Sequence, residues 1–438
     1  MERNTFYIET YGCVSNKSDS HIMATILNKS GYVTSTIEDA EFVIVNTCAV
    51  KQQTENKIKS RLNELFQKYK NETNKHFIIA GCLPHIDPKY IDVVRNLIPN
   101  FSAIIDLDNL NEIPSIFEEI RSGKTNIIVE SKGALDKSET LIDYPKGKIT
   151  GIVPISEGCL GSCTYCCVKN ARGRLQCYNS HSIIENVDHQ LRQGIKQIYL
   201  TSQDCSTYEY ENTKLADLIS DIVDLDYEFF LRIGMLNPKF IVDEVEQLIS
   251  IFNHKKIYQL MHIPIQSGSD NILKLMNRNY RIMDVMDKLN SLRKKFPFLS
   301  ISTDIICGFP GESEEDFNRT INLIKWLKPE ILNVSKFTPR PGTAAKNMLQ
   351  VDSKTIKRRS TVLSDIFRES LMEINTKWKN WEGEVLVLHK GLKKNQVFGR
   401  NFAYKNVFIG NFEGTYGSFV KARISKVEGF NLYAEIIN

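Results

Sequence analysis

The chain has 438 residues, which is too long for one ordinary hydrophobic core and predicts two to four domains. Its hydrophobic fraction of 42% and charged fraction of 25% are typical of soluble globular proteins. No apolar run approaches the roughly 18 residues that a membrane-spanning helix needs, and the first residues lack the apolar core of a signal peptide. Ten cysteines without an export signal predict a reducing, cytoplasmic setting, with thiols as metal ligands or buried groups rather than disulfides.

The net charge is only +4, but positive charge is concentrated near the C-terminus. Residues 377–438 hold ten Lys or Arg and five Asp or Glu, a local excess of +5, so the preceding residues sum to about −1. A small basic segment of this kind favours an anionic partner, of which RNA fits best.

Residues 5–105 repeat a pattern of strand and cysteine three times, and helical apolar spacing follows the first two repeats. The strand-like runs are 6–10, 42–45 and 77–80. The alternation implies a parallel, flavodoxin-like sheet, in which sites gather outside the carboxyl ends of the strands. Cys13, Cys48 and Cys82 each fall at such an end. One such cysteine would be an ordinary buried thiol, but three at equivalent positions predict an iron–sulfur cluster with three protein ligands.

The next segment, residues 106–150, has a weaker pattern. A helix is expected around residues 113–120, and the polar stretch 131–140 is expected to be a connector without a function of its own.

Four of the ten cysteines fall within residues 158–174, GCLGSCTYCCVKNARGR. Three of them have the spacing Cys159-x3-Cys163-x2-Cys166. Three thiolates on one short loop suit an iron–sulfur cluster in which one iron lacks a protein ligand and is open to a substrate or cofactor. A zinc site, which would need further ligands close by, and a disulfide are the alternatives.

The same spacing resembles the signature of the radical S-adenosylmethionine (radical SAM) enzymes, in which an aromatic residue precedes the third cysteine. Tyr165 precedes Cys166, whereas no aromatic residue precedes the adjacent Cys167. We therefore assign Cys166 as the third ligand and expect Cys167 to be a bystander.

Residues 150–345 alternate six strand-like runs with helical patterns, which predicts a partial, TIM-like (β/α)6 barrel with its site at the carboxyl ends of the strands. The runs are 150–155, 197–201, 229–233, 259–265, 300–306 and 331–337. The cysteine loop directly follows the first run. Polar or glycine-rich stretches accompany the others, including 266–269 and 308–312. Each is equally an ordinary strand–helix turn, and only their shared position at one rim favours a site.

The C-terminal part begins with a predicted helix, 353–376, whose basic start is equally a solvated face. Residues 380–438 then change to five short β-runs punctuated by glycine, which predict a small antiparallel barrel of the kind that binds nucleic acids. Lysines and one arginine interleave there with aromatic residues, which gives cations beside stacking surfaces, although the aromatics also fit a barrel core. These residues are Lys390, Lys393, Lys394, Phe398, Arg400, Phe402 and Tyr404.

In this order, the three parts resemble the radical SAM methylthiotransferases along essentially the whole chain. The matching motifs are ETYGCVSNKSDS, VNTCAV, AGCLP, GCLGSCTYC, HIPIQSGSDNILKLMNR, TDIICGFPGE and FTPRPGTAA. The resemblance implies an α/β chain with a methylthiotransferase domain at 1–110, a connector at 111–144, a radical SAM domain at 145–376 and an RNA-binding TRAM domain at 377–438.

Two stretches indicate a branch of that family. CVKNARGRL after the cysteine loop and LRIGMLNP in the third strand look like the archaeal and eukaryotic branch that acts on threonylcarbamoyladenosine in tRNA. The alternatives are the branches that act on isopentenyladenosine in tRNA or on an aspartate of a ribosomal protein, which tend to carry Pro before a shorter basic run. The end of the chain lacks the membrane anchor that eukaryotic members often have, which looks more archaeal.

The resemblance implies two [4Fe–4S] clusters, with the six cysteines named above as metal ligands and catalytic residues. The cluster on the cysteine loop would bind SAM as the radical source, and the N-terminal cluster would supply sulfur that a second SAM methylates. The target would be C2 of the adenine at position 37, in the single-stranded anticodon loop of tRNA. An external one-electron donor and a sulfur donor are further expected partners. Candidate contacts to SAM are Tyr165, Asp204, Gln266, Ser267, Gly308, Gly311, Arg340 and Thr343.

A non-catalytic iron–sulfur protein that transfers electrons or binds RNA is the alternative from another class. The polar stretches at the barrel rim argue against it, and the basic C-terminal segment argues against the ribosomal-protein branch.

Overall fold

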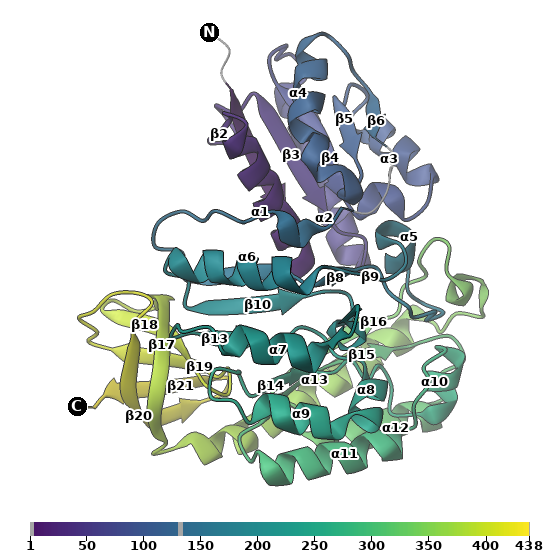
Figure 1. The fold of residues 1–438 in the computed structure, drawn as a ribbon. Coiled ribbons are helices and arrows are strands. Elements are labelled where there is room, and N and C mark those ends of the chain that lie inside the picture. The colour runs from purple at the N-terminus through teal and green to yellow at the C-terminus, as the bar shows by residue number, and fades with distance from the viewer. Residues whose placement is uncertain (1–3, 130–134, 438) are drawn as a thin grey trace.

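The computed structural model describes residues 4–129 and 135–437 (Figure 1). Three parts follow one another along the chain: an N-terminal parallel sheet, a central open barrel and a small closed barrel at the C-terminus. Within the described residues, no helix has the length and apolar character that crossing a membrane requires.

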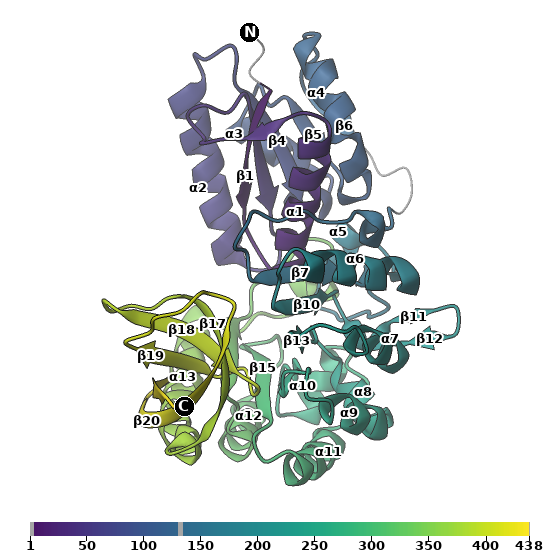
Figure 2. The same cartoon turned by 60° about the vertical axis from the view of Figure 1, so that its left-hand side comes forward.

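The N-terminal part is a six-stranded sheet in which every neighbouring pair is parallel, with the order β2-β1-β3-β4-β5-β6. Its strands are β1 (Thr5–Thr10), β2 (Val33–Thr34), β3 (Phe42–Thr47), β4 (His76–Gly81), β5 (Ala103–Ile105) and β6 (Ile127–Val129). Helices α1 (Val14–Lys29) and α4 (Ile113–Arg121) cover one face, and α2 (Gln52–Tyr69) and α3 (Lys89–Leu97) cover the other (Figure 2). The central strand β3 is buried along its whole length, as expected for a strand covered on both faces. The order confirms the flavodoxin-like expectation.

Helix α4 and strand β6 lie in the segment expected to be a connector. Strand β6 pairs with β5, and α4 buries Ile116 and Phe117 in the N-terminal core. Both elements therefore complete the N-terminal sheet. Residues 130–134, which overlap the polar stretch 131–140, lie outside the described residues.

The central part contains the six predicted parallel strands. They are β7 (Thr150–Pro154), β10 (Gln197–Thr201), β13 (Phe230–Arg232), β14 (Leu260–His262), β15 (Ser300–Cys307) and β16 (Ile331–Lys336). They form two three-stranded sheets, and two isolated parallel bridges, Leu231 to Ile257 and Met235 to His262, join them into one open barrel. The partial (β/α)6 barrel is confirmed.

Helices cover the outside of this barrel (Figure 1). They are α6 (Ser180–Arg192), α7 (Leu215–Val223), α8 (Pro238–Asp243), α9 (Val245–Phe252), α10 (Asp270–Leu275), α11 (Ile282–Lys295), α12 (Glu314–Leu327) and α13 (Ser353–Asn375). The cysteine loop lies between two short strands, β8 (Ser156–Glu157) and β9 (Gln176–Cys177), and includes the five-residue helix α5 (Val168–Arg172).

The C-terminal part is a closed five-stranded barrel with the order β17-β18-β19-β21-β20. Its strands are β17 (Glu382–Lys390), β18 (Gln396–Asn401), β19 (Asn406–Gly410), β20 (Phe419–Glu428) and β21 (Asn431–Ile436). The barrel is not purely antiparallel, because the β19–β21 pair is parallel. Strand β21 follows β20 through a tight turn and inserts between β20 and β19, so it pairs antiparallel with the first and parallel with the second.

The closed barrel docks against the amino ends of the central strands. The carbonyl of Phe402 accepts from the backbone N–H of Gln259, next to the start of β14, at 2.8 Å. The carbonyl of Ala403 accepts from the hydroxyl of Ser300, the first residue of β15, at 2.8 Å. Beside them, Tyr404 is hydrogen-bonded through its hydroxyl to that of Tyr199 on β10 at 2.7 Å. Phe402 and Tyr404 therefore fill a domain interface, and the expectation that they offer stacking surfaces to RNA is wrong.

Candidate functional site

Two sulfur atoms of the cysteine loop, those of Cys159 and Cys163, lie next to Gly161. The backbone N–H of Gly161 donates to the Cys159 sulfur at 3.2 Å, and a Cβ placed on Gly161 would lie 3.2 Å from that sulfur and 3.9 Å from the Cys163 sulfur. Thr164 fastens the loop to the end of α10 through its hydroxyl. The guanidinium of Arg278 contacts the Cys163 sulfur at 3.6 Å. Donors aimed at sulfur are what a thiolate-bound cluster uses to distribute its charge.

All ten cysteines are free thiols, which rules out the disulfide alternative for this loop. In residues 4–129 and 135–437, no group of three or more His, Cys, Asp and Glu side chains is arranged to hold a metal ion. The case for a cluster on this loop rests on its three thiols and the donors aimed at their sulfur atoms.

The three N-terminal cysteines follow β1, β3 and β4, and close backbone approach brings them together. A Cβ on Gly12, beside Cys13, would lie 2.7 Å from the Cβ of Cys48 and 3.0 Å from its sulfur. Gly81, before Cys82, would clash in the same way with the end of β3. Both glycines have positive φ, 118° and 93°, which other residues rarely adopt. The three cysteines therefore lie together at one edge of the sheet, as expected. A larger residue at Gly12 would take up the space that the Cys48 sulfur occupies.

Burial changes the acidity of several of these thiols. It raises the pKa of Cys82 to about 12, and it raises the pKa of Cys48 and Cys159 as well. Arg172 partly offsets the effect at Cys82. Without iron these thiols are protonated at neutral pH, so binding a cluster releases protons.

Helix α5 carries Arg172 from the cysteine loop to the N-terminal cysteines. The Nε of Arg172 donates to the Cys82 sulfur at 3.2 Å. Its two terminal nitrogens pair with Asp19 on α1 at 2.7 Å and with Glu157 on β8 at 2.6 Å. Lys137 pairs with both carboxylates from the segment between the domains. These four residues, which we call the buried charge cluster, contain two cations and two anions, so each charge removed from water has a partner.

A second arginine, Arg340, joins the central domain to the N-terminal domain near Cys48. Arg340 is 4% exposed, pairs with Glu55 of α2 at 2.6 Å and donates to the carbonyl of Ala49 at 2.6 Å. Cys167 donates to the same carbonyl, at 3.6 Å, and is buried among N-terminal residues. The loop next to Cys48 is therefore held by the central domain.

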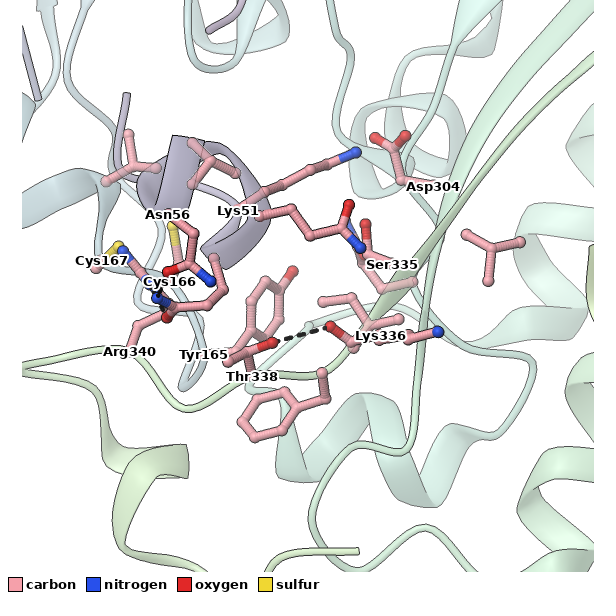
Figure 3. Close-up of a pocket in the computed structure, with 18 residues that line it drawn as sticks. Lys51, Asn56, Tyr165, Cys166, Cys167, Asp304, Ser335, Lys336, Thr338 and Arg340 are labelled. Atoms are coloured by element: carbon pink, nitrogen blue, oxygen red, sulfur yellow. Dashed lines mark hydrogen bonds between the residues drawn. The ribbon is translucent and has the colours of Figure 1, made fainter. Parts of the chain in front are cut away.

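A cavity of about 500 Å³ lies between the cysteine loop, at Cys166 and Cys167, and the segment that follows Cys48 (Figure 3). The N-terminal domain contributes residues 50–53 and Asn56, and the barrel contributes the ends of β15 and β16. Tyr165 and Cys166 lie on its wall, and Cys166 is exposed to it. A volume of this size suits a modified nucleoside or a similar ligand.

The candidates for SAM contacts separate into two groups. Tyr165, Gln266 and Arg340 line the cavity. The others do not line it, and they make structural contacts. Asp204 accepts from Ser206 and Asn237, Ser267 meets Thr320, Gly308 donates its N–H to Glu312, Gly311 turns the chain at φ 84°, and Thr343 donates to the carbonyl of Arg340.

Several residues at this site escaped the sequence patterns. Lys51, Asn56, Asp304 and Lys336 line the cavity, and Arg172 reaches the N-terminal cysteines. Asp304 had a usable signal, because it lies inside the motif TDIICGFPGE. For Lys51 and Arg172, proximity to Cys48 and Cys166 in the sequence was the available hint.

Comparison with known proteins agrees with this architecture. The model of the family described as "Uncharacterized protein family UPF0004" matches residues 5–99, and that of the "Radical SAM superfamily" matches residues 153–324. Among solved structures, TsrM from Kitasatospora setae, a radical S-adenosylmethionine methyltransferase with cobalamin and a [4Fe-4S] cluster bound, is similar in fold. Its TM-score is 0.60 at 12% identity over 79% of this chain and 77% of that one. The fold and the cysteine loop define a radical SAM enzyme.

Relatives over the whole length narrow the class. The probable threonylcarbamoyladenosine tRNA methylthiotransferase of Pyrococcus horikoshii is 38% identical over 98% of this chain and 99% of its own. The human threonylcarbamoyladenosine tRNA methylthiotransferase is 32% identical over 95% of this chain and 71% of its own. The chain belongs to the threonylcarbamoyladenosine tRNA methylthiotransferase family. Membership implies SAM and a [4Fe–4S] cluster as cofactors.

Proposed function

We propose that the protein methylthiolates C2 of threonylcarbamoyladenosine at position 37 of tRNA, next to the anticodon. The observation that carries this proposal is the cavity bordered on one side by Cys166 and on the other by the loop that follows Cys48. An adenine in this cavity lies between a radical source and a sulfur source. The family membership of the chain supports the same substrate.

The six cysteines would hold two [4Fe–4S] clusters, one on each side of the cavity. When bound, the clusters and SAM supply a radical able to take hydrogen from an unactivated C–H bond, and sulfur and a methyl group to replace it. The chain's own residues bind and orient. Tyr165 and Gln266 shape the wall beside Cys166, and Arg340 closes the cavity against the N-terminal domain and keeps water out.

The remaining candidates act by keeping the rim in shape. Asp204, Ser267, Gly308, Gly311 and Thr343 hold strand–helix turns through the contacts described above, and none needs to touch SAM for this. The reaction consumes electrons and sulfur, so an external one-electron donor and a sulfur donor are required partners. A tRNA substrate favours the cytoplasm as the place of action.

The C-terminal barrel, which we interpret as the TRAM domain, offers an RNA-binding surface that keeps Phe398 and the three lysines of the expected one but not Phe402 and Tyr404. Four rings stand side by side on neighbouring strands: His389, Phe398, Phe408 and Tyr433, with centroids 4.6, 5.4 and 5.7 Å apart in that order. We call them the aromatic row. Lys426 lies over Tyr433 at one end, and exposed lysines 390, 393 and 394 follow the other. Phe408 is buried within the row, whereas His389, Phe398 and Tyr433 are partly or fully exposed, and exposed rings beside cations fit a single-stranded RNA.

Nucleoside analysis tests the proposal. Deleting the gene and digesting total tRNA should remove 2-methylthio-threonylcarbamoyladenosine from the mass spectrum, and the wild-type gene should restore it. Persistence of that nucleoside would exclude this substrate. Loss of 2-methylthio-isopentenyladenosine instead would assign the protein to the other tRNA branch. Reductive cleavage of SAM by the reconstituted protein separates either enzyme from a non-catalytic iron–sulfur protein.

A further inference from the structure

Two lysines on the wall of the cavity have no carboxylate partner. Lys51 immediately precedes helix α2, and Lys336 is the last residue of β16, so they approach the cavity from different domains. In the described part of the chain, neither forms an ion pair. Arg340, the third cation on the wall, is already paired with Glu55. The cavity therefore has a surplus of positive charge.

The one carboxylate on the described wall does not cancel that surplus. Asp304 accepts hydrogen bonds from His262 at 3.1 Å and from Asn333 at 2.7 Å. Lys51 lies near enough for its charge to contribute to the lowered pKa of Asp304. One acid, already satisfied by two neighbours, faces two lysines. A cavity with such a balance selects a ligand that carries a negative charge.

The surroundings of Lys51 strengthen the preference for an anion. Lys51 is the N-cap residue of an 18-residue helix, and the side chains of Gln52, Gln53 and Asn56 from its first turns line the cavity as well. The amino end of a helix carries a partial positive charge, and the amide groups supply additional hydrogen-bond donors. The wall from residue 51 to residue 56 is thus suited to a small anionic group.

We propose that Lys51 and Lys336 bind the carboxylate of the threonylcarbamoyl group, an inference that rests on the function proposed above. The threonylcarbamoyl substituent ends in a carboxylate, whereas an isopentenyl substituent is purely hydrocarbon. In Figure 3 both lysine side chains extend away from Cys166 and Cys167, that of Lys51 toward Asp304. A base with its C2 edge toward the cysteines would direct its N6 substituent to the lysines.

This pairing gives the pocket its substrate selectivity. Lys51 and Lys336 are exposed in the free protein, so the selectivity comes from their charge pairing with the carboxylate rather than from rescue of buried groups. An isopentenyl group would leave the charges of Lys51 and Lys336 without a partner. The two lysines then discriminate between substituents that occupy the same position on the adenine.

The test uses the reconstituted holoenzyme with two full-length tRNAs, one carrying threonylcarbamoyladenosine and one its carboxylate methyl ester. The wild-type enzyme should prefer the free carboxylate. In K51M and K336M the KM for that tRNA should rise about tenfold or more, with a smaller change in kcat. In both variants the preference for the free carboxylate over the methyl ester should become smaller. The K51R variant keeps the positive charge and should retain most of that preference. Lys57, an exposed lysine on the same helix outside the cavity, provides the control variant K57M, which should behave as wild type.

Other anions give different outcomes. If the variants lose equal affinity for acid and ester tRNAs, the lysines bind backbone phosphate. If they lose SAM cleavage in the absence of RNA, the lysines bind the carboxylate of SAM. Either result overturns the inference. A wild-type enzyme that modifies both tRNAs equally overturns the inference alone, whereas one that modifies only isopentenyladenosine overturns the proposed function with it. Iron content and thermal unfolding of each variant confirm that the protein is folded and loaded.

Discussion

Arg172 donates a hydrogen bond to the sulfur of Cys82 at 3.2 Å, although 90 positions separate them in the chain. Arg172 belongs to the same loop as Cys159, Cys163 and Cys166. One continuous segment therefore supplies the ligands of one proposed cluster and a charged donor to a ligand of the other. Donors to ligand sulfur atoms change the potential and solvent access of iron–sulfur clusters.

Replacing Arg172 tests this arrangement. In R172M, Asp19 and Glu157 face each other with Lys137 as the one remaining cation of the buried charge cluster. Removing one partner from a buried ionic group costs about 3–5 kcal/mol. We expect thermal and urea unfolding to show that loss, together with reduced iron content. Arg174, exposed on the same loop, gives the control R174M. Equal stability of the two variants would contradict the role of Arg172.

Cys82→Ala should abolish methylthiolation and spare SAM cleavage, because it removes a ligand of the N-terminal cluster and leaves the cysteine loop complete. Iron content should fall to about half. The matched control is Cys167→Ala, since Cys167 is buried between the two sites and donates to a carbonyl. It should keep all its iron. Full methylthiolation by the Cys82 variant would refute the second cluster, and iron loss in the Cys167 variant would make Cys167 a ligand.

The aromatic row gives a prediction about RNA. Tyr433→Ala should weaken tRNA binding about tenfold at fixed salt, since a base stacked on an aromatic ring contributes about 1–3 kcal/mol. Phe402 has a structural role instead, because it packs against Trp378 in the core of the barrel and against Phe298 of the central domain. Phe402→Ala should lower stability with a smaller effect on affinity. Binding isotherms and unfolding curves for both variants separate the two roles, and an unchanged Kd for the Tyr433 variant would exclude the row as a binding surface.

His21 predicts a pH dependence of stability. Burial, with Lys148 and Lys17 nearby, lowers its pKa to about 4, and its ring packs edge-on against Tyr144. The unfolded chain binds a proton near pH 6.5 and the folded chain does not, so stability falls as the pH drops from 6.5 toward 4. Between pH 7 and 5 the loss is about 2 kcal/mol. Over the same pH range, the free energy of unfolding of the His21→Gln variant should fall by about 2 kcal/mol less than that of the wild type. Parallel curves for the two proteins would show that His21 does not titrate in this way.

Local patterns predicted the parts of the fold that depend on short stretches of chain. The apolar runs before Cys13, Cys48 and Cys82 are strands of one parallel sheet, so the convergence of these cysteines followed from topology alone. Strand β6 was missed because three residues are too short for a period-two signal, and its place depends on pairing with β5.

Local sequence patterns could not predict contacts between residues that are far apart in the chain. Lys51 and Lys336 meet at one cavity although nearly the whole central domain separates them, and each alone resembles an ordinary surface lysine. Lys137 appears in a polar stretch that predicts a solvated connector, yet it is 1% exposed, because Asp19 and Glu157 come from two other segments. The roles of Phe402 and Tyr404 changed for the same reason, since docking of the barrel partly buries them against the central domain.

The position of the C-terminal barrel has a consequence for the length of the RNA substrate. The barrel docks where β14 and β15 begin, whereas the cavity lies where β15 and β16 end. The eight residues of β15 span about 26 Å. An RNA that engages both places must extend beyond the few nucleotides around its target base. A minimal anticodon-loop fragment would reach the cavity but not the barrel. The stem of the tRNA therefore contributes to recognition by the enzyme.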